Sequence, residues 1–496
     1  MNCPIRLLVL GCALLCPPAL PPNSVVRAAE PVVDIGSRRE LFVDRFLLDR
    51  LTDARLVLHR PVDQGPVVRF DRPWEGQFSG YCTVLQDGPL VRLYYRGHPQ
   101  ATKDGDTDEV TCYAESRDGV QWTKPDLGLF EVRGTKQNNV VLADAAPVTH
   151  NFSPFLDRNP GASADARYKA LGGTMSSGLV AYASADGLRW RRLAPEPVIP
   201  KALVDFPYMF DSQNVTHWSA EQGCYVCYFR VFKDKVRRIA RSTSDDYLHW
   251  SKPALMEYEH AGQPAPIEHL YTNQTHPYFR APHLDVSIAA RFMPGRQVLT
   301  DEQAKAVNVH PRYFKDCSDA IFMTTRGAAV YDRTFLEGFI RPGVGPQNWV
   351  SRTNYPALGI IQTGPAEMSI YTNQDYGQPT AHLRRYALRL DGFASLQAGY
   401  SGGEALTRPV KFAGSRLLLN FATSAAGSVR VELQDAQGKA LPGFTLAESR
   451  ELIGNEIERA VSWQGGDDVS RVAGQPVRLR LVLKDADVFA FRFAQE

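Results

Sequence analysis

The stretch Ser116–Trp122, "SRDGVQW", recurs along this chain and indicates how it folds. Ser184–Trp190 reads "SADGLRW", and Ser244–Trp250 reads "SDDYLHW", with a tyrosine in place of the glycine. A weaker copy, "TRGAAVY", occupies Thr325–Tyr331. A frame that returns along a sequence indicates a repeated supersecondary unit, so the repeat is the first guide to the architecture.

Each copy follows a strand-like run, such as "VTCYAES" (110–116) or "GLVAYAS" (178–184). The Asp-Gly pair tolerates the left-handed backbone of a tight hairpin turn, and the tryptophan then begins the next strand. The frame resembles a shortened Asp-box of sialidases, which is a structural motif. We therefore predict that Asp118, Asp186 and Asp246 are turn residues and not catalysts.

The spacing of the repeat predicts the size of the unit. Trp122 and Trp190 are 68 residues apart, Trp190 and Trp250 are 60 apart, and Trp250 and Tyr331 are 81 apart. Four average strands with their turns need roughly 40 to 50 residues, so each interval holds one four-stranded sheet and longer loops. About five such units fit before residue 400. The sequence therefore predicts an all-β protein with a five-bladed β-propeller over residues 29–400.

The last part of the chain, residues 401–496, has a different sequence pattern. In "GSVRVELQDAQGKALPGF" (427–444) and "QPVRLRLVLKDADVFAFRF" (475–493), apolar and polar residues alternate around short turns. This period of two is typical of antiparallel strands with one buried face. We expect a C-terminal β-sandwich that packs against the propeller and completes its last blade.

The N-terminus predicts export. Arg6 precedes the apolar run Leu7–Cys16, and small residues follow, which is the pattern of a secretory signal peptide over residues 1–28. The run is too short to span a bilayer, so we predict no membrane span and a secreted or periplasmic location. Lipid anchoring at Cys12 is the alternative reading of this segment.

Composition narrows the class of partner. Lys and Arg number 56 against 54 Asp and Glu, so no basic surplus exists for a nucleic acid. "CYVC" (Cys224–Cys227) has metal or redox spacing, but it lies in an alternating strand in which residues three apart face opposite sides. The mature cysteines are odd in number, which does not suit a disulfide scaffold. They are Cys82, Cys112, Cys224, Cys227 and Cys317.

The chemistry that this chain favours is based on carboxylates. The sequence contains no phosphate-binding Gly-rich loop and no His-Glu-x-x-His zinc motif. We predict no cofactor and no metal site, with a structural calcium in the channel as the alternative. Glycosidic bonds are cleaved by two carboxyl groups, and Glu and Asp with neighbouring Trp and Tyr occur at several strand starts.

A propeller gathers its site from the first strand of each blade. Candidate residues are therefore polar side chains that interrupt an apolar run there. As catalytic residues we predict Glu75, Asp211 and Glu367. As substrate-binding residues we predict Trp74, Asn151, Asn214, His276, Asp319, Trp349 and Arg352.

Several stretches resemble the propeller glycoside hydrolases of families 32, 43 and 68, and most of all secreted bacterial proteins with a family-32-like N-terminal domain. The stretches are "ELFVDRFLLD" (40–49), "RPWEG" (72–76), "RYKALGG" (167–173), "LRRYALRLDGFASLQAGYSGGEALTRP" (383–409) and "SVRVELQDAQGKALPGF" (428–444). The resemblance implies a propeller with a C-terminal sandwich, glycosidase activity and a carbohydrate partner. It covers nearly the whole mature chain.

The catalytic motifs of family 32 are absent. Asn-Asp-Pro-Asn-Gly, Arg-Asp-Pro and Glu-Cys do not occur, and Asp44 in "LFVDRF" lacks the flanking residues of the family's nucleophile. We therefore transfer no catalytic residue from that family. The hypothesis is a secreted glycoside hydrolase with paired carboxylates in the funnel, retaining or inverting. The alternatives are a non-catalytic carbohydrate-binding propeller and another propeller chemistry such as a sialidase, lyase or phosphorylase.

Overall fold

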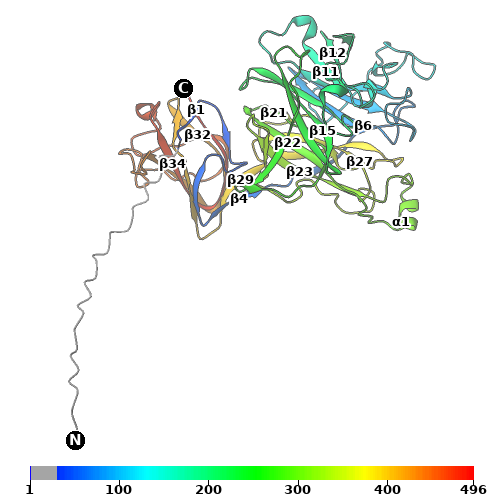
Figure 1. Ribbon diagram of the computed structural model, residues 1–496. Helices are drawn as coiled ribbons and strands as arrows, with labels where there is room; N and C mark the ends of the chain where they lie inside the picture. Colours follow the sequence, from blue (N-terminus) through cyan, green and yellow to red (C-terminus); the bar gives the residue numbers. More distant parts are fainter. Residues whose placement is uncertain (2–30, 496) are drawn as a thin grey trace.

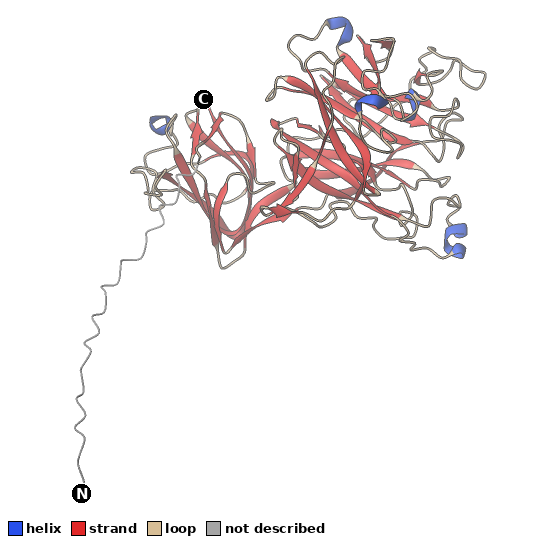
Figure 2. Ribbon diagram, in the orientation of Figure 1, coloured by secondary structure: helices blue, strands red, loops and turns tan. Residues whose placement is uncertain are grey.

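The computed structural model describes Met1 and residues 31–495, and the chain is almost entirely β-structure there (Figures 1 and 2). The predicted signal peptide therefore lies, apart from Met1, outside the described residues. One α-helix occurs in the described part, α1 (Asp301–Ala306), and Thr300 caps it in a capping box with Gln303. The short 3-10 helices are η1 (Val148–His150), η2 (Ala164–Ala166), η3 (Lys201–Leu203) and η4 (Ser470–Val472). No helix in the described part of the chain is long and apolar enough to cross a membrane.

Successive antiparallel sheets of residues 62–389 are arranged as the blades of a β-propeller (Figure 1). Sheet 1 contains β6 (Gly80–Asp87), β7 (Leu90–Gly97), β8 (Val110–Ser116) and β9 (Val140–Leu142). Sheet 2 contains β10 (Ser153–Leu156), β11 (Tyr168–Gly172), β12 (Val180–Ser184) and β13 (Arg191–Arg192). Sheet 3 contains β14 (Val215–Ser219), β15 (Cys224–Lys233), β16 (Val236–Ser244) and β17 (Ala254–Leu255).

The next two sheets are larger. Sheet 4 contains β18 (Glu257–His260), β19 (Gln263–Pro264), β20 (His269–Thr272), β21 (His276–Tyr278), β22 (Ala281–Met293), β23 (Cys317–Thr325) and β24 (Val330–Asp332). Sheet 5 contains β25 (Tyr355–Pro356), β26 (Ile361–Gln362), β27 (Glu367–Gln374), β28 (His382–Arg389) and the earlier strand β5 (Val62–Arg69). Because β5 pairs with β28, the last of these sheets is completed by the N-terminal part of the chain and not, as we expected, by the C-terminal tail.

The first strands of the sheets contact one another in a circle. β6 contacts β10, β10 contacts β14, and β14 contacts β21. β22 then contacts β25, and β27 contacts β6. Thr83 of β6 also forms a parallel bridge with Leu358, which follows β25. The sheets therefore surround a common centre.

The repeated kernels are the turns between the third and fourth strands of sheets 1, 2 and 3. In the third kernel, Ser244 Oγ accepts from the backbone N of Tyr247 at 2.9 Å, and Asp246 Oδ1 accepts from the next two backbone N–H groups at 2.8 Å. The same bonds recur at Asp118 and Asp186, so the prediction of turn residues is confirmed. Tyr247 has a φ of 70°, the left-handed backbone of the glycines that it replaces.

A separate ten-stranded sheet joins the two ends of the described chain (Figure 1, where β1 lies near β32 and β34, and β4 lies beside β29). Its strands are β1 (Val33–Gly36), β2 (Glu40–Leu41), β3 (Leu48–Thr52), β4 (Ala54–Leu58), β29 (Ala394–Ala398), β30 (Gly403–Thr407), β31 (Val410–Phe412), β32 (Arg416–Asp435), β33 (Asn455–Ala460) and β34 (Val477–Ala494). This C-terminal sheet encloses its own core around Trp463. The predicted domain boundary near residue 400 stays a prediction, and residues 33–58 pair with strands on both sides of it, with β29 before it and with β30 and β31 after it.

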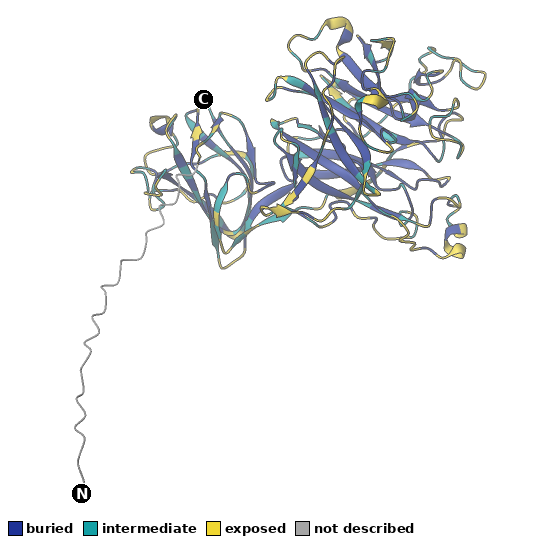
Figure 3. Cartoon of the chain, in the orientation of Figure 1, coloured by how far each residue is buried: buried dark blue, intermediate teal, exposed yellow. Residues whose placement is uncertain are grey.

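Burial follows the strands, while the loops at both ends of the sheets are exposed (Figure 3). The five cysteines of the described chain are free thiols. Cys224 and Cys227 pack into different apolar clusters on opposite faces of β15, as the alternation predicts. They therefore form no shared metal site.

Candidate functional site

Five side chains meet where the chain enters the innermost strands, and we call them the central cluster. Tyr81 lies at the start of β6, His150 precedes β10, and Asp211 precedes β14. Tyr271 lies on β20, and Arg352 precedes β25. The rings of Tyr81 and His150 are 5.5 Å apart, and Arg352 Cζ lies 5.7 Å from the Tyr271 ring. Each blade-like sheet therefore contributes one side chain.

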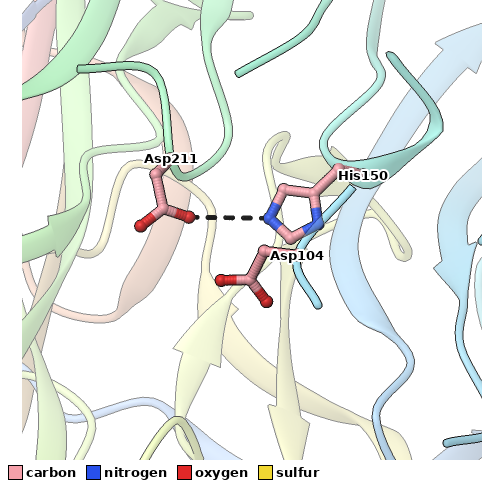
Figure 4. A group of neighbouring side chains, drawn as sticks. All are labelled: Asp104, His150 and Asp211. Atoms are coloured by element: carbon pink, nitrogen blue, oxygen red, sulfur yellow. Dashed lines mark ion pairs between the residues drawn. The ribbon is translucent and has the colours of Figure 1, made fainter. Parts of the chain in front are cut away.

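A carboxylate and histidine group lies at the edge of the central cluster (Figure 4). His150 Nε2 faces Asp211 Oδ1 at 3.7 Å, and Asp104 approaches from the loop before β8. One ligand atom of each of these three residues lies within 4.8 Å of the others. On the other side of the imidazole, Nδ1 is 3.0 Å from both carboxylate oxygens of Glu109. Asp211 and Glu109 thus face the two nitrogens of a buried histidine, and Asp104 lies close to Asp211 and His150.

The charges of this group are set by their neighbours. Burial alone would raise the pKa of Asp211, but Arg230, His150 and Arg352 hold it well below its usual range. Burial alone would lower the pKa of His150, but Asp211 and Glu109, facing its two nitrogens, raise it. Asp211 is therefore ionised at neutral pH, and with a side chain 43% exposed it remains accessible from solvent.

Two buried arginines hold the acids from the second strands of their sheets. Arg230 on β15 donates from Nη2 to Asp211 Oδ2 at 2.5 Å. Arg96 on β7 lies 4.0 Å from Glu109 and donates to the Phe78 carbonyl at 2.8 Å. Both arginines are nearly inaccessible to solvent. These arginines therefore fix the carboxylates at the end of the propeller where the central cluster lies, which we call the mouth.

The backbone is strained around the central cluster. Tyr81, Phe210, Gln274 and Arg352 have φ values of 50°, 66°, 51° and 59°, in the left-handed region that non-glycine residues rarely adopt. Each such residue costs of order 1–3 kcal/mol and persists where the surrounding structure enforces it, commonly at functional sites. The strain occurs at the segments that enter β6, β14, β21 and β25.

Below the central cluster, amide side chains fill the channel. Gln213 donates to Thr83 Oγ1 at 2.8 Å, and Gln274 donates to Gln213 Oε1 at 2.6 Å and to the Pro356 carbonyl at 2.7 Å. All three side chains are buried. These hydrogen bonds link sheets 1, 3, 4 and 5 across the centre.

A cleft of about 660 Å³ lies on sheet 4, where β22 ends and β23 begins. Its volume is in the range of sites for small organic ligands. Asp319 and Trp349 line it, and Arg291 bridges the Asp319 and Glu268 carboxylates at 2.6 and 3.0 Å. Two of the predicted substrate-binding residues thus share one cleft.

The structure places the predicted catalytic and substrate-binding residues in several different parts of the molecule. Asp211 and Arg352 belong to the central cluster. Asn151 is fully buried and donates to the carbonyls of Gly173, Phe210 and Ser212, so it anchors the segment that carries Asp211. Asn214 donates to the Phe210 carbonyl at 3.2 Å.

Of the remaining predicted residues, none bonds to Asp211 in the described chain. Burial lowers the pKa of His276 to about 4, and its Nδ1 lies 2.8 Å from the carbonyl oxygen of Gln274. Trp74 packs in an apolar cluster with its Nε1 on Asn139. Glu75 is wholly buried and contacts Lys124 Nζ at 2.6 Å.

Glu367 lies away from the mouth. It begins β27, whose other end, Gln374, donates to Asn354 at 3.1 Å beside the central cluster. Seven residues of extended strand span roughly 23 Å. Glu367 pairs instead with Arg385 and accepts from Thr363 Oγ1 at 2.8 Å. The structure does not bring Glu75 and Glu367 together with Asp211.

Sequence reasoning missed much of the mouth: Tyr81, Arg96, Asp104, Glu109, Arg230 and Tyr271. A signal existed for Arg230, which is the lone charge in the apolar run "CYVCYFRVF" (224–232), and for Arg96, which shares the run "VRLYYRG" (91–97) only with Arg92. Such a charge is rarely buried without a partner. Asp104 had no such signal, since it lies in the polar loop "TKDGDTDE".

The three residues of Figure 4 could also hold a cation. Within the described chain, His150 Nε2 and Asp211 Oδ1 are buried and have no hydrogen-bond partner. A carboxylate on the far nitrogen, here Glu109, is the usual support of a metal-binding histidine. The neighbouring guanidiniums of Arg96 and Arg230 oppose such binding by charge repulsion.

The sequence matches no family model. Uncharacterized protein Rv1502 of Mycobacterium tuberculosis is 28% identical over 166 residues, which cover 30% of this chain and 48% of that protein. Uncharacterized protein MT1551 of the same species is 29% identical over 164 residues. The chain spans about half the length of the curated relatives it matches.

Solved structures overlap with about two thirds of the chain. The α-L-arabinofuranosidase PaAbf62A of Podospora anserina, in complex with cellotriose, has 10% identity and a TM-score of 0.40, covering 66% of this chain and 96% of that one. The catalytic domain of the GH62 α-L-arabinofuranosidase of Coprinopsis cinerea has 10% identity and a TM-score of 0.39, covering 66% and 97%. At these TM-scores we take no function from either structure.

Proposed function

We propose that this protein is a secreted or periplasmic glycoside hydrolase whose catalytic pair is Asp211 and Asp104. The observation that carries the proposal is the approach of the two carboxylates to within 4.8 Å at the propeller mouth. Retaining glycosidases place their two carboxyl groups about 5–5.5 Å apart, whereas inverting enzymes need about 6.5–9.5 Å. The apolar run Leu7–Cys16 supports export.

The proposal includes the architecture. We infer that the sheets of residues 62–389 are five blades of one ring, closed by β5, and that the C-terminal sheet is a β-sandwich. The circular contacts of the first strands support the ring. The enclosed core around Trp463 supports the sandwich.

Asp211 has the properties of the nucleophile. It is ionised at neutral pH because Arg230 and His150 stabilise its charge. Asp104, on a loop, would protonate the glycosidic oxygen while the Asp211 carboxylate attacks the anomeric carbon and the leaving sugar departs. Water would then hydrolyse the glycosyl ester, with the Asp104 carboxylate accepting its proton. Asp211 and Asp104 are restored at the end of this cycle.

The test is hydrolysis of a glycan panel by the mature protein, two variants of Asp211 and one control variant. We expect Asp211→Asn to lose at least about 10³-fold in kcat, as removal of a nucleophile does. External azide should partly restore cleavage by Asp211→Ala, with a glycosyl azide as product. Asp468→Asn, an exposed acid on the C-terminal sheet, is the matched control and should be unchanged. Full activity of Asp211→Asn would refute the proposal.

Two further arms separate this mechanism from its rivals. Activity should survive EDTA, and its loss, restored by calcium, would assign the Asp104, His150 and Asp211 group to a metal. The second candidate function is a non-catalytic carbohydrate-binding propeller. It is favoured by the aromatic rings and guanidinium that meet in the central cluster, where Arg352 lies over the rings of Tyr271 and Tyr313, because such groups can bind a sugar without cleaving it. Glycan binding without cleavage of any panel member would support it.

A further inference from the structure

Arginines are in excess around the central cluster. Three guanidiniums surround the ring of Tyr271: Arg230 Cζ lies 4.4 Å from the ring centroid, Arg237 Cζ 5.2 Å and Arg352 Cζ 5.7 Å. A fourth, Arg96, lies 4.8 Å over the ring of Tyr81. These residues come from β7, β15, β16 and the segment before β25, so the fold collects them from distant parts of the chain.

The acids at the mouth do not balance these charges. Arg230 pairs with Asp211, and Arg96 lies near Glu109. Within residues 31–495, neither Arg237 nor Arg352 forms an ion pair with a carboxylate. The Arg237 guanidinium has a contact of 3.4 Å with the His269 ring, and Arg352 has only ring contacts, with Tyr271 and Tyr313.

A buried guanidinium without a carboxylate or other acceptor beside it is unfavourable, and a bound anion would remove that cost. Arg230 is 2% exposed, yet its Nη1 has no hydrogen-bond partner in the described chain. Burial and the neighbouring charge of Arg230 lower the pKa of Arg237. Stacking on one tyrosine ring offsets only part of the cost of desolvating three guanidiniums. Arg230 therefore has a donor, Nη1, that no group of the described residues satisfies.

Space exists beside two of the four arginines, Arg96 and Arg352. Arg96 and Arg352 line a cavity of about 20 Å³ together with Tyr81, Tyr355 and Tyr376. A volume of this size accommodates about one water molecule, or the oxygen of a ligand group. Arg352 is also only partly buried, so a ligand that enters the mouth can contact it.

We propose that Arg352, with Arg237 and the free Nη1 of Arg230, binds an anionic substituent of the sugar, a carboxylate or a sulfate ester, so that the substrate is an acidic glycan. This inference rests on the proposed function, since it names the substrate class of the same site. The fork of a guanidinium matches two oxygens of such a group, which a neutral hydroxymethyl cannot offer. A neutral glycan would leave the arginines unpaired.

The test measures binding and needs no turnover. The mature protein is titrated with galacturonic acid and its methyl ester, and with galactose 6-sulfate and galactose, by calorimetry or ligand-observed NMR. Each pair differs by one negative charge. We expect each acid to bind about 10- to 100-fold more tightly than its neutral counterpart, as one or two charge-assisted hydrogen bonds provide. The pair with the larger ratio identifies carboxylate or sulfate as the natural group.

Two variants locate the effect. Arg352→Gln should abolish the preference, and Arg352→Lys should keep part of it, because lysine retains the charge but not the fork. Arg459→Gln, a 57% exposed arginine of the C-terminal sheet, controls for the net charge and should bind like the wild type. Circular dichroism of each variant checks the fold. Equal binding of acid and ester, or an unchanged preference in a folded Arg352→Gln, would overturn the inference.

The outcomes separate the two proposals. Acids that bind while no glycan is cleaved would leave this inference standing and remove the proposed hydrolase. Cleavage of a neutral glycan, with no preference for the acids, would support the proposed hydrolase and remove the inference of an acidic substrate.

Discussion

Acid should loosen the contact between the C-terminal sheet and the propeller through one buried carboxylate, Glu40. It lies on β2, which pairs with β34, yet its side chain contacts sheet 4. His283 Nε2 on β22 is 3.1 Å from Oε1, and Arg326 Nη1 is 3.2 Å from Oε2. The Glu40 side chain has no solvent exposure. Replacing it by glutamine removes the charge and keeps the shape.

The magnitude follows from linkage. Burial alone would raise the pKa of Glu40, but His283 and Arg326 hold it at about 2, against 4.5 when exposed. Because the folded pKa is the lower one, the charge stabilises the fold fully above pH 4.5 and progressively less as the pH falls toward 2. The shift corresponds to about 3 kcal/mol, of which about 2 kcal/mol is lost by about pH 3.

The assay is urea unfolding followed by tryptophan fluorescence, at about pH 7 and about pH 3. We expect the gap in unfolding free energy between wild type and Glu40→Gln to shrink by about 2 kcal/mol between the two conditions. Glu221→Gln is the matched control, since Glu221 is a 56% exposed acid on the same Arg38 and should contribute less than about 1 kcal/mol. A gap that stays constant with pH would refute the reasoning.

Three further changes test other parts of the structure. Glu109→Gln should lower the pKa of His150, because the carboxylate that faces its Nδ1 is lost. An NMR titration of the His150 ring measures this pKa, and an unchanged value would contradict the geometry. Asp186→Ala removes an acceptor of two backbone N–H bonds of 2.8 Å and should cost about 1–3 kcal/mol of unfolding free energy, whereas an unaffected urea midpoint would deny its role as a turn residue. Trp463→Ala empties the core of the C-terminal sheet and should cost about 3–5 kcal/mol by the same assay, with a cost below about 1 kcal/mol arguing against that packing.

Local patterns predicted what is local in this molecule. The Ser-x-Asp-Gly kernels form their hydrogen bonds within four residues, so their role could be read directly from the sequence. The alternation in "CYVC" placed Cys224 and Cys227 on opposite faces for the same reason. Asp211 and Arg352 could be found because a charge inside an apolar segment needs a specific surrounding.

Long-range pairing could not be read in this way. β5 completes a sheet whose other strands follow some 300 residues later, and residues 33–58 join the C-terminal sheet across a similar distance. A strand pattern fixes which face is buried, but not which distant edge it pairs with.

The same limit explains the candidate site. Glu367 and Asp211 both stand beside a strand start, yet the first strand of a blade starts at the mouth and the second starts at the opposite end. A sequence period of two does not distinguish these ends, because it is unchanged when a strand runs in the reverse direction. What does distinguish them is the partner: Glu367 is neutralised by Arg385 in its own sheet, whereas Asp211 meets His150 from the neighbouring sheet. Asp211 also pairs with Arg230 of its own sheet, so what selects it over Glu367 as the residue on which catalysis would depend is its contact with His150 where the innermost strands begin.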